Sequence, residues 1–319
     1  MTNQPEAHPV TVPNGIDEAS ITQHSFTTRD DVELYYEIVG DGDATMVLAN
    51  GLGARLYSWG PVLRHFKDEF QFLIWDYRGL FESGAEGEIR RLNIMEHAED
   101  LNELLETEGV DSAVVTGWSM GVQVGLEFAS LYPESVEGLV LLNGSFGHIF
   151  YSGFQPLLPI PYMHGFLHKL VEWARQRKNL LNKIGQLVQD NMDTIVNLQL
   201  ALSPGSTNRD EMRQAMRQYV KDIFGTDLKN YLRLFQELDA HSVYHKLPEI
   251  KAPALVFSGG LDVLTPTYDS KKIHRRLPNS RHRHLWLANH FAMLEYPQKV
   301  VEQMRDFFKD HQLLPHNNR

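Results

Sequence analysis

The sequence predicts an α/β fold with a mostly parallel eight-stranded sheet, helices on both faces, and a helical cap inserted after the sixth strand. Short apolar runs alternate with stretches of helical periodicity, the pattern of a parallel sheet covered on both faces. This alternation stops for roughly a hundred residues and then resumes, which indicates an insertion. A length of 319 residues suits one large core carrying such an insertion, since domains average about 150 residues.

Eight apolar runs are the expected strands. The first two, 21–27 and 32–39, are joined by Thr28-Arg29-Asp30-Asp31, which predicts a hairpin and therefore an antiparallel edge. The remaining strands are expected at 46–49, 70–75, 113–118, 139–142, 254–258 and 284–287. Apolar residues recurring at three- and four-residue steps predict helices at 59–68, 94–108, 122–131 and 300–311.

The same patterns divide the chain. Both ends are polar and lack periodicity, so we expect them to be loose. The cap is rich in Leu, Phe, Tyr and Met, and three prolines near its start forbid a continuous helix there. The expected division is a loose tail at 1–20, a core at 21–144 and 248–312, a cap at 145–247, and a second loose tail at 313–319.

Composition excludes several classes of protein. Lys and Arg number 30 against 41 Asp and Glu, and the net charge of −11 repels nucleic acid, so no nucleic-acid partner is expected. Cys is absent, which excludes a disulfide framework, a thiolate metal site and a cysteine nucleophile. No apolar run reaches about 20 residues, so no membrane span is expected. The polar start lacks the pattern of a secretory signal, and we expect a cytoplasmic protein.

A Gly-x-Ser-x-Gly pattern provides the first chemical signal. Gly117-Trp118-Ser119-Met120-Gly121 ends one apolar run and precedes a helical pattern. A serine at such a turn takes a strained backbone, and small flanking residues relieve the crowding. The alternative is a helix-capping serine in a Gly-rich turn. As a nucleophile, Ser119 requires a base and an acid from elsewhere in the chain.

Asp262 and His290 are the candidates for those two roles. Each follows one of the last two apolar runs, on a loop at the carboxyl end of an expected strand. Such loops emerge along one edge of a parallel sheet, so both side chains can meet Ser119. A turn-forming aspartate is the alternative reading of Asp262.

Other polar residues are weaker candidates. Asn143 occupies the nearest other position for the acid, but a neutral amide cannot stabilise an imidazolium as a carboxylate does. His164 and His168 are four residues apart, yet they lack the glutamate of a zinc-protease helix. We therefore expect no metal site.

An oxyanion requires two preorganised backbone donors. The N–H of Met120 is one candidate because it follows the nucleophile. The loop Asn50-Gly51-Leu52-Gly53, which follows the run 46–49, offers the N–H of Leu52, since its glycines let the backbone approach a ligand. A simple turn is the alternative for this loop.

With the Ser, Asp and His loops in this order, the chain resembles the α/β-hydrolase superfamily, in its serine-nucleophile branch with a helical cap. Asp76-Tyr77-Arg78-Gly79 with Ser83 is similar to that family's Asp-x-Arg-Gly-x-Gly-x-Ser segment, and residues 290–297 are similar to its His-x-x-x-Leu-Glu-x-Pro tail. The resemblance implies a nucleophile, a base, an orienting acid and two oxyanion donors, which would be Ser119, His290, Asp262, and Leu52 with Met120.

The chain departs from the family pattern at two positions. Asn50 stands where His is common, and we expect its side chain to hold the loop by hydrogen bonds. Phe81 stands where glycine is usual. A serine nucleophile argues against the dehalogenase and epoxide-hydrolase branches, whose chemistry requires a carboxylate.

The expected function is hydrolysis of small to medium apolar carboxylic esters, lactones or thioesters through an acyl-enzyme, without a cofactor. Its partner would be a small apolar acyl substrate. Trp118, Phe146 and Phe291 are the expected pocket residues, roofed by cap residues such as Phe150, Tyr151, Phe154 and Leu157. These aromatic residues are alternatively the cap's own core.

Three other functions stay open at this point. Similar capped enzymes with the same triad hydrolyse carbon-carbon bonds of diketones, and a small-molecule receptor on a hydrolase scaffold is the non-enzymatic alternative. A nicotinamide enzyme is disfavoured, because Gly51-Leu52-Gly53 lacks the third glycine of that motif. The basic group Arg175, Arg177 and Lys178 is interpreted as a solvated helix face.

Overall fold

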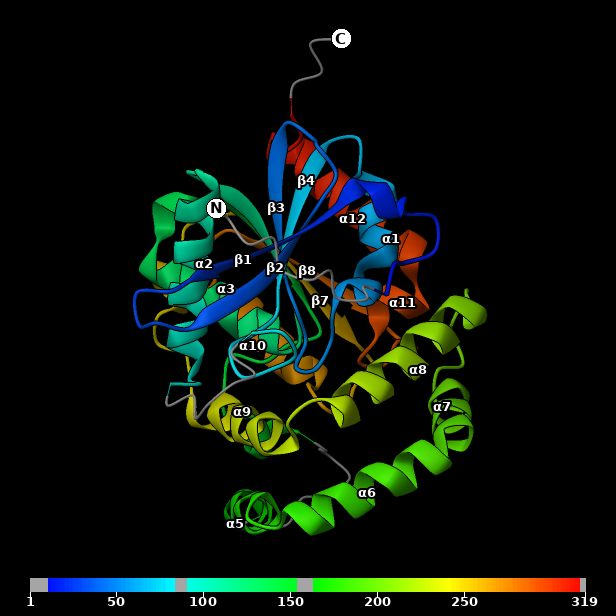
Figure 1. Cartoon of the computed structure of the whole chain (residues 1–319). Coiled ribbons are helices and arrows are strands. Elements are labelled where there is room, and N and C mark those ends of the chain that lie inside the picture. Colours follow the sequence, from blue (N-terminus) through cyan, green and yellow to red (C-terminus); the bar gives the residue numbers. More distant parts are fainter. Residues whose placement is uncertain (1–10, 84–90, 154–162, 316–319) are drawn as a thin grey trace.

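The computed structural model describes residues 11–83, 91–153 and 163–315. One eight-stranded sheet crosses the molecule, and helices cover both of its faces (Figure 1). The strand order is β1-β2-β4-β3-β5-β6-β7-β8, in which β2 is antiparallel to both neighbours and all other pairs are parallel. This confirms the predicted fold class and its antiparallel edge. The strands are β1 (Ile21–Thr27), β2 (Glu33–Val39), β3 (Ala44–Ala49), β4 (Phe70–Trp75), β5 (Ala113–Trp118), β6 (Val136–Leu142), β7 (Ala254–Gly259) and β8 (Ser280–Leu285).

Burial decides how well each strand could be found in the sequence. The strands β5 and β7 are buried along their whole length, so they read as continuous apolar runs. The edge strand β8 is only half-buried, and its alternating Arg and His residues interrupt any such run. The predicted strand at 284–287 is therefore wrong in its bounds, because β8 begins at Ser280.

The helices of the core lie between or after the strands, and the described residues form six further helices between β6 and β7. The core helices are α1 (Gly60–Phe66), α2 (Ile94–Glu108), α3 (Met120–Leu131), α10 (Thr267–Arg276), α11 (Ala292–Glu295) and α12 (Pro297–Asp310). The other six are α4 (Ile149–Ser152), α5 (Met163–Arg175), α6 (Lys178–Asp190), α7 (Met192–Ala201), α8 (Arg209–Gly225) and α9 (Leu228–Ala240).

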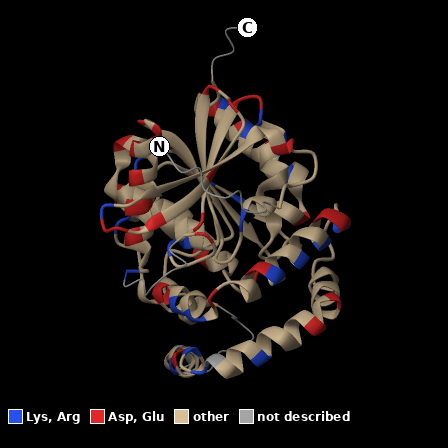
Figure 2. Ribbon diagram, in the orientation of Figure 1, with Lys and Arg blue, Asp and Glu red and all other residues tan. Residues whose placement is uncertain are grey.

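Two apolar cores flank the sheet. Side chains of α2, α3 and α10 pack on one face, and those of α1 and α12 pack on the other. Figure 2 shows the charged residues on the outer helices and loops, with few of them on the central strands. The sheet is thus buried on both sides, as a mostly parallel sheet requires.

Helix α2 shows how local sequence sets an element. The Asn93 side chain accepts a hydrogen bond from the N–H of Glu96 over 3.1 Å and caps the start of the helix. Gly109 ends it at φ 66°, a left-handed conformation that glycine adopts without strain. The buried residues Leu101 and Leu104 face the core. The observed bounds coincide with the predicted helix at 94–108.

The segment between β6 and β7, called the helical insertion below, contains α4 to α9. Figure 1 shows α8 and α9 nearer to the sheet, with α5 and α6 beyond them. An insertion after the sixth strand was predicted at this place. The proline-containing stretch 154–162 near its start lies outside the described residues.

Residues 11–20 belong to the segment expected to be a loose tail, and they contact the folded chain. Pro13 is buried, and the Asn14 side chain donates to Gln214 of α8 over 2.9 Å. Residues 1–10 lie outside the described part. None of the helices in the described ranges is both long and apolar enough to cross a membrane.

Candidate active site

Ser119 lies at the junction of β5 and α3. Its φ of 56° and ψ of −110° form a backbone conformation that residues other than glycine rarely adopt. The hydroxyl makes no capping bond to α3 and lies 2.8 Å from Nε2 of His290. The capping alternative therefore does not describe Ser119.

Close backbone contact explains both glycines of the motif. A Cβ at Gly117 would lie 2.3 Å from the carbonyl oxygen of Gly121. A Cβ at Gly121 would lie 2.0 Å from the carbonyl oxygen of Ala49 in β3. Only glycine fits at either position, so the turn that exposes Ser119 depends on both.

His290 lies on the loop after β8, where its ring connects two partners. Nδ1 is 3.0 Å from Oδ2 and 3.2 Å from Oδ1 of Asp262, so the ring proton sits on Nδ1. Nε2 is then free to accept the proton of Ser119 Oγ. The Trp118 indole N–H donates to the backbone carbonyl of His290 over 2.9 Å, which ties the two loops together.

The carboxylate of Asp262 is buried and well supplied with donors. It accepts the N–H groups of Leu264 and Thr265 over 3.0 and 2.9 Å, and the Asn143 amide over 3.0 Å. Burial by itself raises the pKa of this carboxyl, but the charge of His290 and these hydrogen bonds outweigh it, and the pKa lies below its usual value. Asp262 therefore both forms the turn and binds His290.

Asn50 anchors the loop that follows β3. The Trp59 indole N–H donates to Asn50 Oδ1 over 2.7 Å, and Asn50 Nδ2 donates to the carbonyl of Trp75 over 3.2 Å. The Tyr77 hydroxyl donates to the Asn50 carbonyl over 2.8 Å. The buried Asn50, which stands where the family usually has histidine, thus fixes this loop to the core by hydrogen bonds.

The two predicted oxyanion donors lie beside Ser119. Leu52 and Met120 both line the cavity that Ser119 and His290 enter. Met120 is the first residue of α3, so its N–H is one of those that a helix leaves without an intrahelical acceptor. Both residues therefore border the space at Ser119, and their role as oxyanion donors stays a prediction.

The cavity at Ser119 has a volume of about 280 Å³, near the lower end of the usual range for ligand pockets. Most of its lining is apolar and comes from both the core and the helical insertion. No Arg, Lys, Asp or Glu is among the described residues that line it. The apolar and aromatic lining residues are Leu52, Trp118, Met120, Ile149, Phe150, Tyr219, Tyr231, Phe235, Leu238, Leu264 and Phe291.

Of the three predicted pocket residues, Trp118 and Phe291 line this cavity and Phe146 does not. The Phe146 ring packs against Tyr244 at 5.0 Å between centroids and joins the core under the insertion. Periodicity could not show this, because the chain turns sharply just before Phe146. Phe150 lines the cavity, whereas Phe154 and Leu157 lie outside the described residues.

Phe81, the second departure from the family pattern, adopts φ 49°. This is the left-handed conformation that the usual glycine takes without strain. Its ring lies 5.0 Å from the Arg55 guanidinium, and its N–H donates to Thr226 of the insertion over 3.3 Å. Phe81 thus joins the core to the insertion and is not among the residues lining the cavity.

Sequence reasoning assigned no role to Thr265 or Glu295. Thr265 supplies its N–H to Asp262, and the Asp-x-x-Thr spacing of an Asx-type turn is the signal that could have found it. Glu295 is fully buried and accepts the N–H of Asn289, next to His290, over 3.1 Å. Burial raises the pKa of Glu295 to about 7.

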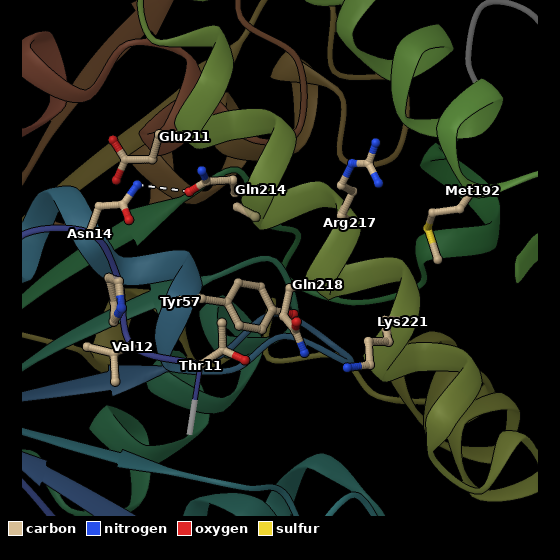
Figure 3. A pocket seen from close by; sticks show the side chains of 12 residues that line it. Thr11, Val12, Asn14, Tyr57, Met192, Glu211, Gln214, Arg217, Gln218 and Lys221 are labelled. Atoms are coloured by element: carbon tan, nitrogen blue, oxygen red, sulfur yellow. Dashed lines mark hydrogen bonds between the residues drawn. The ribbon is translucent and has the colours of Figure 1, made fainter. Parts of the chain in front are cut away.

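Nothing in the described part of the chain groups three or more metal-ligating side chains. His168 is engaged elsewhere, with Nε2 2.7 Å from Oδ2 of Asp239. A second cavity of about 430 Å³ contains none of the predicted catalytic residues and is lined by residues 11–14, Tyr57, Met192 and α8. Figure 3 shows Tyr57 there, between Val12 and Gln218.

Comparisons with known proteins agree with this fold. The family model of the alpha/beta hydrolase fold matches residues 44–297. A candidate carbamate hydrolase, RutD, of Azorhizobium caulinodans is 28% identical, covering 82% of this chain and 90% of that protein. A 2-hydroxy-6-oxononadienedioate/2-hydroxy-6-oxononatrienedioate hydrolase of Paraburkholderia phymatum is 26% identical, covering 87% and 91%.

Among solved structures, the enol-lactonase of Burkholderia xenovorans has a TM-score of 0.69 at 22% identity, covering 90% of this chain and all of that one. An esterase of Exiguobacterium antarcticum has the same TM-score at 18% identity, covering 89% and 98%. The sheet order and the family match together define an α/β hydrolase. The chain belongs to the alpha/beta hydrolase fold family.

Gly121→Ala tests the packing of the strand-to-helix turn. The added Cβ meets the rigid carbonyl of Ala49, so we expect a loss of about 3 kcal/mol or more in the free energy of unfolding, measured by urea denaturation. Gly125→Ala in the same helix is the control, because its nearest neighbour is a Val115 methyl group 3.2 Å away. Equal stability of the two variants would contradict the close contact.

Glu295→Gln tests the buried carboxyl beside His290. Because its folded-state pKa of about 7 lies above the ordinary 4.5, stability is lost as pH rises from 4.5 to 7, and the full cost remains above pH 7. Gln mimics the protonated form, so the variant should be more stable than the wild type at pH 8.5 by on the order of 2 kcal/mol.

Urea denaturation of wild type and Glu295→Gln at pH 5 and pH 8.5 measures this difference. The exposed Glu302→Gln on α12 is the control and should show the same pH dependence as the wild type. A stability difference between wild type and Glu295→Gln that does not grow with pH would show that Glu295 is ionised throughout.

Proposed function

We propose that the protein is a serine hydrolase of small, uncharged acyl compounds, namely carboxylic esters, lactones or thioesters. The observation that carries the proposal is the hydrogen-bonded row of Ser119, His290 and Asp262 at the edge of an apolar cavity. A serine hydroxyl becomes nucleophilic when a positioned base takes its proton and an acid orients that base. The three side chains stand at the distances such a transfer requires.

In the proposed reaction, His290 Nε2 takes the proton of Ser119 Oγ while the oxygen attacks the substrate carbonyl. Asp262 keeps the imidazole in the tautomer with the Nδ1 proton and stabilises its charged form. The N–H groups of Leu52 and Met120 bind the oxyanion, and His290 returns the proton to the leaving group. Water activated by the same imidazole then releases the acid.

The helical insertion would act as a cap over this site. Phe150, Tyr219 and Phe235 of the insertion line the same cavity as Ser119. Their burial of an acyl chain contributes about 0.8 kcal/mol for each methylene. A cap of this kind excludes water from the reacting carbonyl and selects acyl groups by length.

Substrate charge is limited by the lining of the cavity. A carboxylate buried without a positive partner loses several kcal/mol of hydration that nothing replaces. The relative from Paraburkholderia phymatum is named for dioate substrates. The described lining of this cavity has no Arg or Lys to pair with a second carboxylate, so the proposal favours uncharged acyl groups. An uncharged diketone is the competing substrate for the same three residues.

Ser119→Ala tests the nucleophile. We expect kcat for p-nitrophenyl butyrate to fall by about five to six orders of magnitude, because no other group in the row can form the acyl-enzyme. Ser145→Ala is the matched control, since Ser145 lines the same cavity but its hydroxyl donates to the Gly147 carbonyl over 2.9 Å. Its kcat should stay within about threefold of the wild type.

A fluorophosphonate probe completes this test. It should label the wild type and Ser145→Ala, and leave Ser119→Ala unlabelled. Unchanged ester turnover in Ser119→Ala would exclude the mechanism. A wild type that binds acyl compounds without turnover or labelling would indicate a receptor. Faster cleavage of a vinylogous diketone than of the ester would indicate a carbon-carbon bond hydrolase.

The substrate-charge limit is tested with two four-carbon acyl esters, p-nitrophenyl butyrate and p-nitrophenyl hemisuccinate. We expect kcat/KM for the butyrate to be at least about 100-fold higher, because the hemisuccinate carries a carboxylate into the cavity. Gln199→Lys, which adds a cation to the lining, should narrow that ratio. Equal turnover of both esters by the wild type would contradict the assignment.

A further inference from the structure

We propose that Tyr219, which belongs to the helical insertion, is a positioning residue for the loop Asn50-Gly51-Leu52-Gly53, called the oxyanion loop below, and holds it in its working conformation. The inference rests on the proposed function and goes beyond it, because it makes the insertion part of the catalytic apparatus. The contact that carries it is a hydrogen bond of 3.0 Å from the Tyr219 hydroxyl to the backbone carbonyl of Leu52. Leu52 is the residue whose N–H is the proposed oxyanion donor.

Successive backbone carbonyls of the oxyanion loop accept hydrogen bonds from different donors. The Asn50 carbonyl accepts the Tyr77 hydroxyl, and the Gly51 carbonyl accepts the N–H of Ala54 over 2.9 Å. Both donors belong to the core. The peptide that follows Leu52 is held from outside the core, by Tyr219. The conformation of Leu52 is therefore fixed on one side by the loop itself and on the other by the insertion.

The oxyanion loop is closely packed between the core and the insertion, which restricts its movement. A Cβ at Gly51 would lie 2.7 Å from the Trp118 ring, so the backbone of the loop packs directly on that ring. A Cβ at Gly53, at φ 78°, would lie 2.8 Å from both Ile223 and Tyr231. The loop is thus clamped between the residue before the nucleophile and two helices of the insertion.

One face of α8 makes these contacts. Tyr219, Asp222 and Ile223 have the i, i+3, i+4 spacing that places side chains on one side of a helix. Ile223 reaches Gly53, and the charge of Asp222 acts on Tyr57 just beyond the loop. This face of α8 therefore contacts Leu52 and Gly53 in the oxyanion loop and Tyr57 just after it.

The Tyr219 ring itself is anchored independently of its hydroxyl. It packs against the rings of Trp118 at 6.3 Å and Phe291 at 5.8 Å, between centroids, and it lines the cavity. The hydroxyl is also hydrogen-bonded to that of Tyr231. Replacing Tyr219 by Phe keeps the ring contacts and removes the hydroxyl that holds Leu52, together with its hydrogen bond to Tyr231.

Loss of the hydrogen bond from Tyr219 to Leu52 should destabilise the transition state more than the bound substrate. Charge on the oxyanion develops only as the serine attacks, so a loosened donor lowers kcat while substrate binding persists. Removal of one oxyanion donor costs about 100- to 1,000-fold, and a donor that is loosened but present should cost less. We expect Tyr219→Phe to lower kcat about tenfold and to leave KM within about twofold.

The experiment compares wild type, Tyr219→Phe and Tyr244→Phe with p-nitrophenyl butyrate, and it measures inhibition by two ketones of equal chain length. Tyr244 is the control phenol, because it packs against Phe146 away from the cavity lining. A trifluoromethyl ketone adds to the serine and forms an oxyanion, whereas the methyl ketone only binds. Thermal unfolding is recorded in parallel to compare the folding of the variants.

In Tyr219→Phe we expect the affinity for the trifluoromethyl ketone to fall about tenfold and that for the methyl ketone to stay unchanged, with Tyr244→Phe equal to the wild type. A rise in KM with equal weakening of both ketones would show that Tyr219 only lines the cavity. Wild-type kinetics in Tyr219→Phe would also overturn the inference. A wild type with no Ser119-dependent turnover or fluorophosphonate labelling would instead refute the proposed function beneath it.

Discussion

The burial of the Asp262 carboxylate is the constraint on which the arrangement of the site depends. A buried negative charge is tolerated only when donors surround it, and here they come from three separate loops. Thr265 follows in the same loop, Asn143 follows β6, and His290 follows β8. These hydrogen bonds form only if the loops after β6, β7 and β8 lie side by side at one edge of the sheet. The same arrangement brings His290 to Ser119.

The helical insertion is attached to this site by buried polar contacts on two sides. Tyr219 of α8 holds the Leu52 carbonyl on the nucleophile side of the cavity. In the loop that carries His290, the Asn289 amide donates to the Ser203 hydroxyl over 2.6 Å, and Ser203 is fully buried. A segment that moved away as one rigid lid would exchange both of these hydrogen bonds for bonds to water, at a net cost of about 0.5–1.5 kcal/mol each. The contacts favour an insertion that stays in place while substrates enter around it.

The core and its polar residues could be predicted from the sequence because both follow simple geometric rules. Ser119, Asp262 and His290 each come directly after an apolar run, and the ends of parallel strands share one edge. No comparable geometric rule predicts which side chains of the insertion face the cavity. Phe146 precedes the first helix of the insertion, where no periodicity indicates which neighbour its ring meets, and the periodicity of α8 does not show that Tyr219 faces the cavity. Tertiary contacts, of Phe146 with Tyr244 and of Tyr219 with Trp118 and Phe291, determine both positions.

Two carboxyl groups lie near His290, and their surroundings shift their pKa values in opposite directions. The charge of His290 and several donors hold the pKa of Asp262 below its usual value, whereas burial raises that of Glu295 to about 7. The imidazole is oriented by its hydrogen bond to Asp262, and at mildly acidic pH Glu295 is mainly protonated. Glu295 still accepts the Asn289 N–H when protonated, and it supports the loop without competing for the ring proton. The contacts thus give Asp262 an electrostatic role toward His290, and Glu295 a structural role in the adjoining loop.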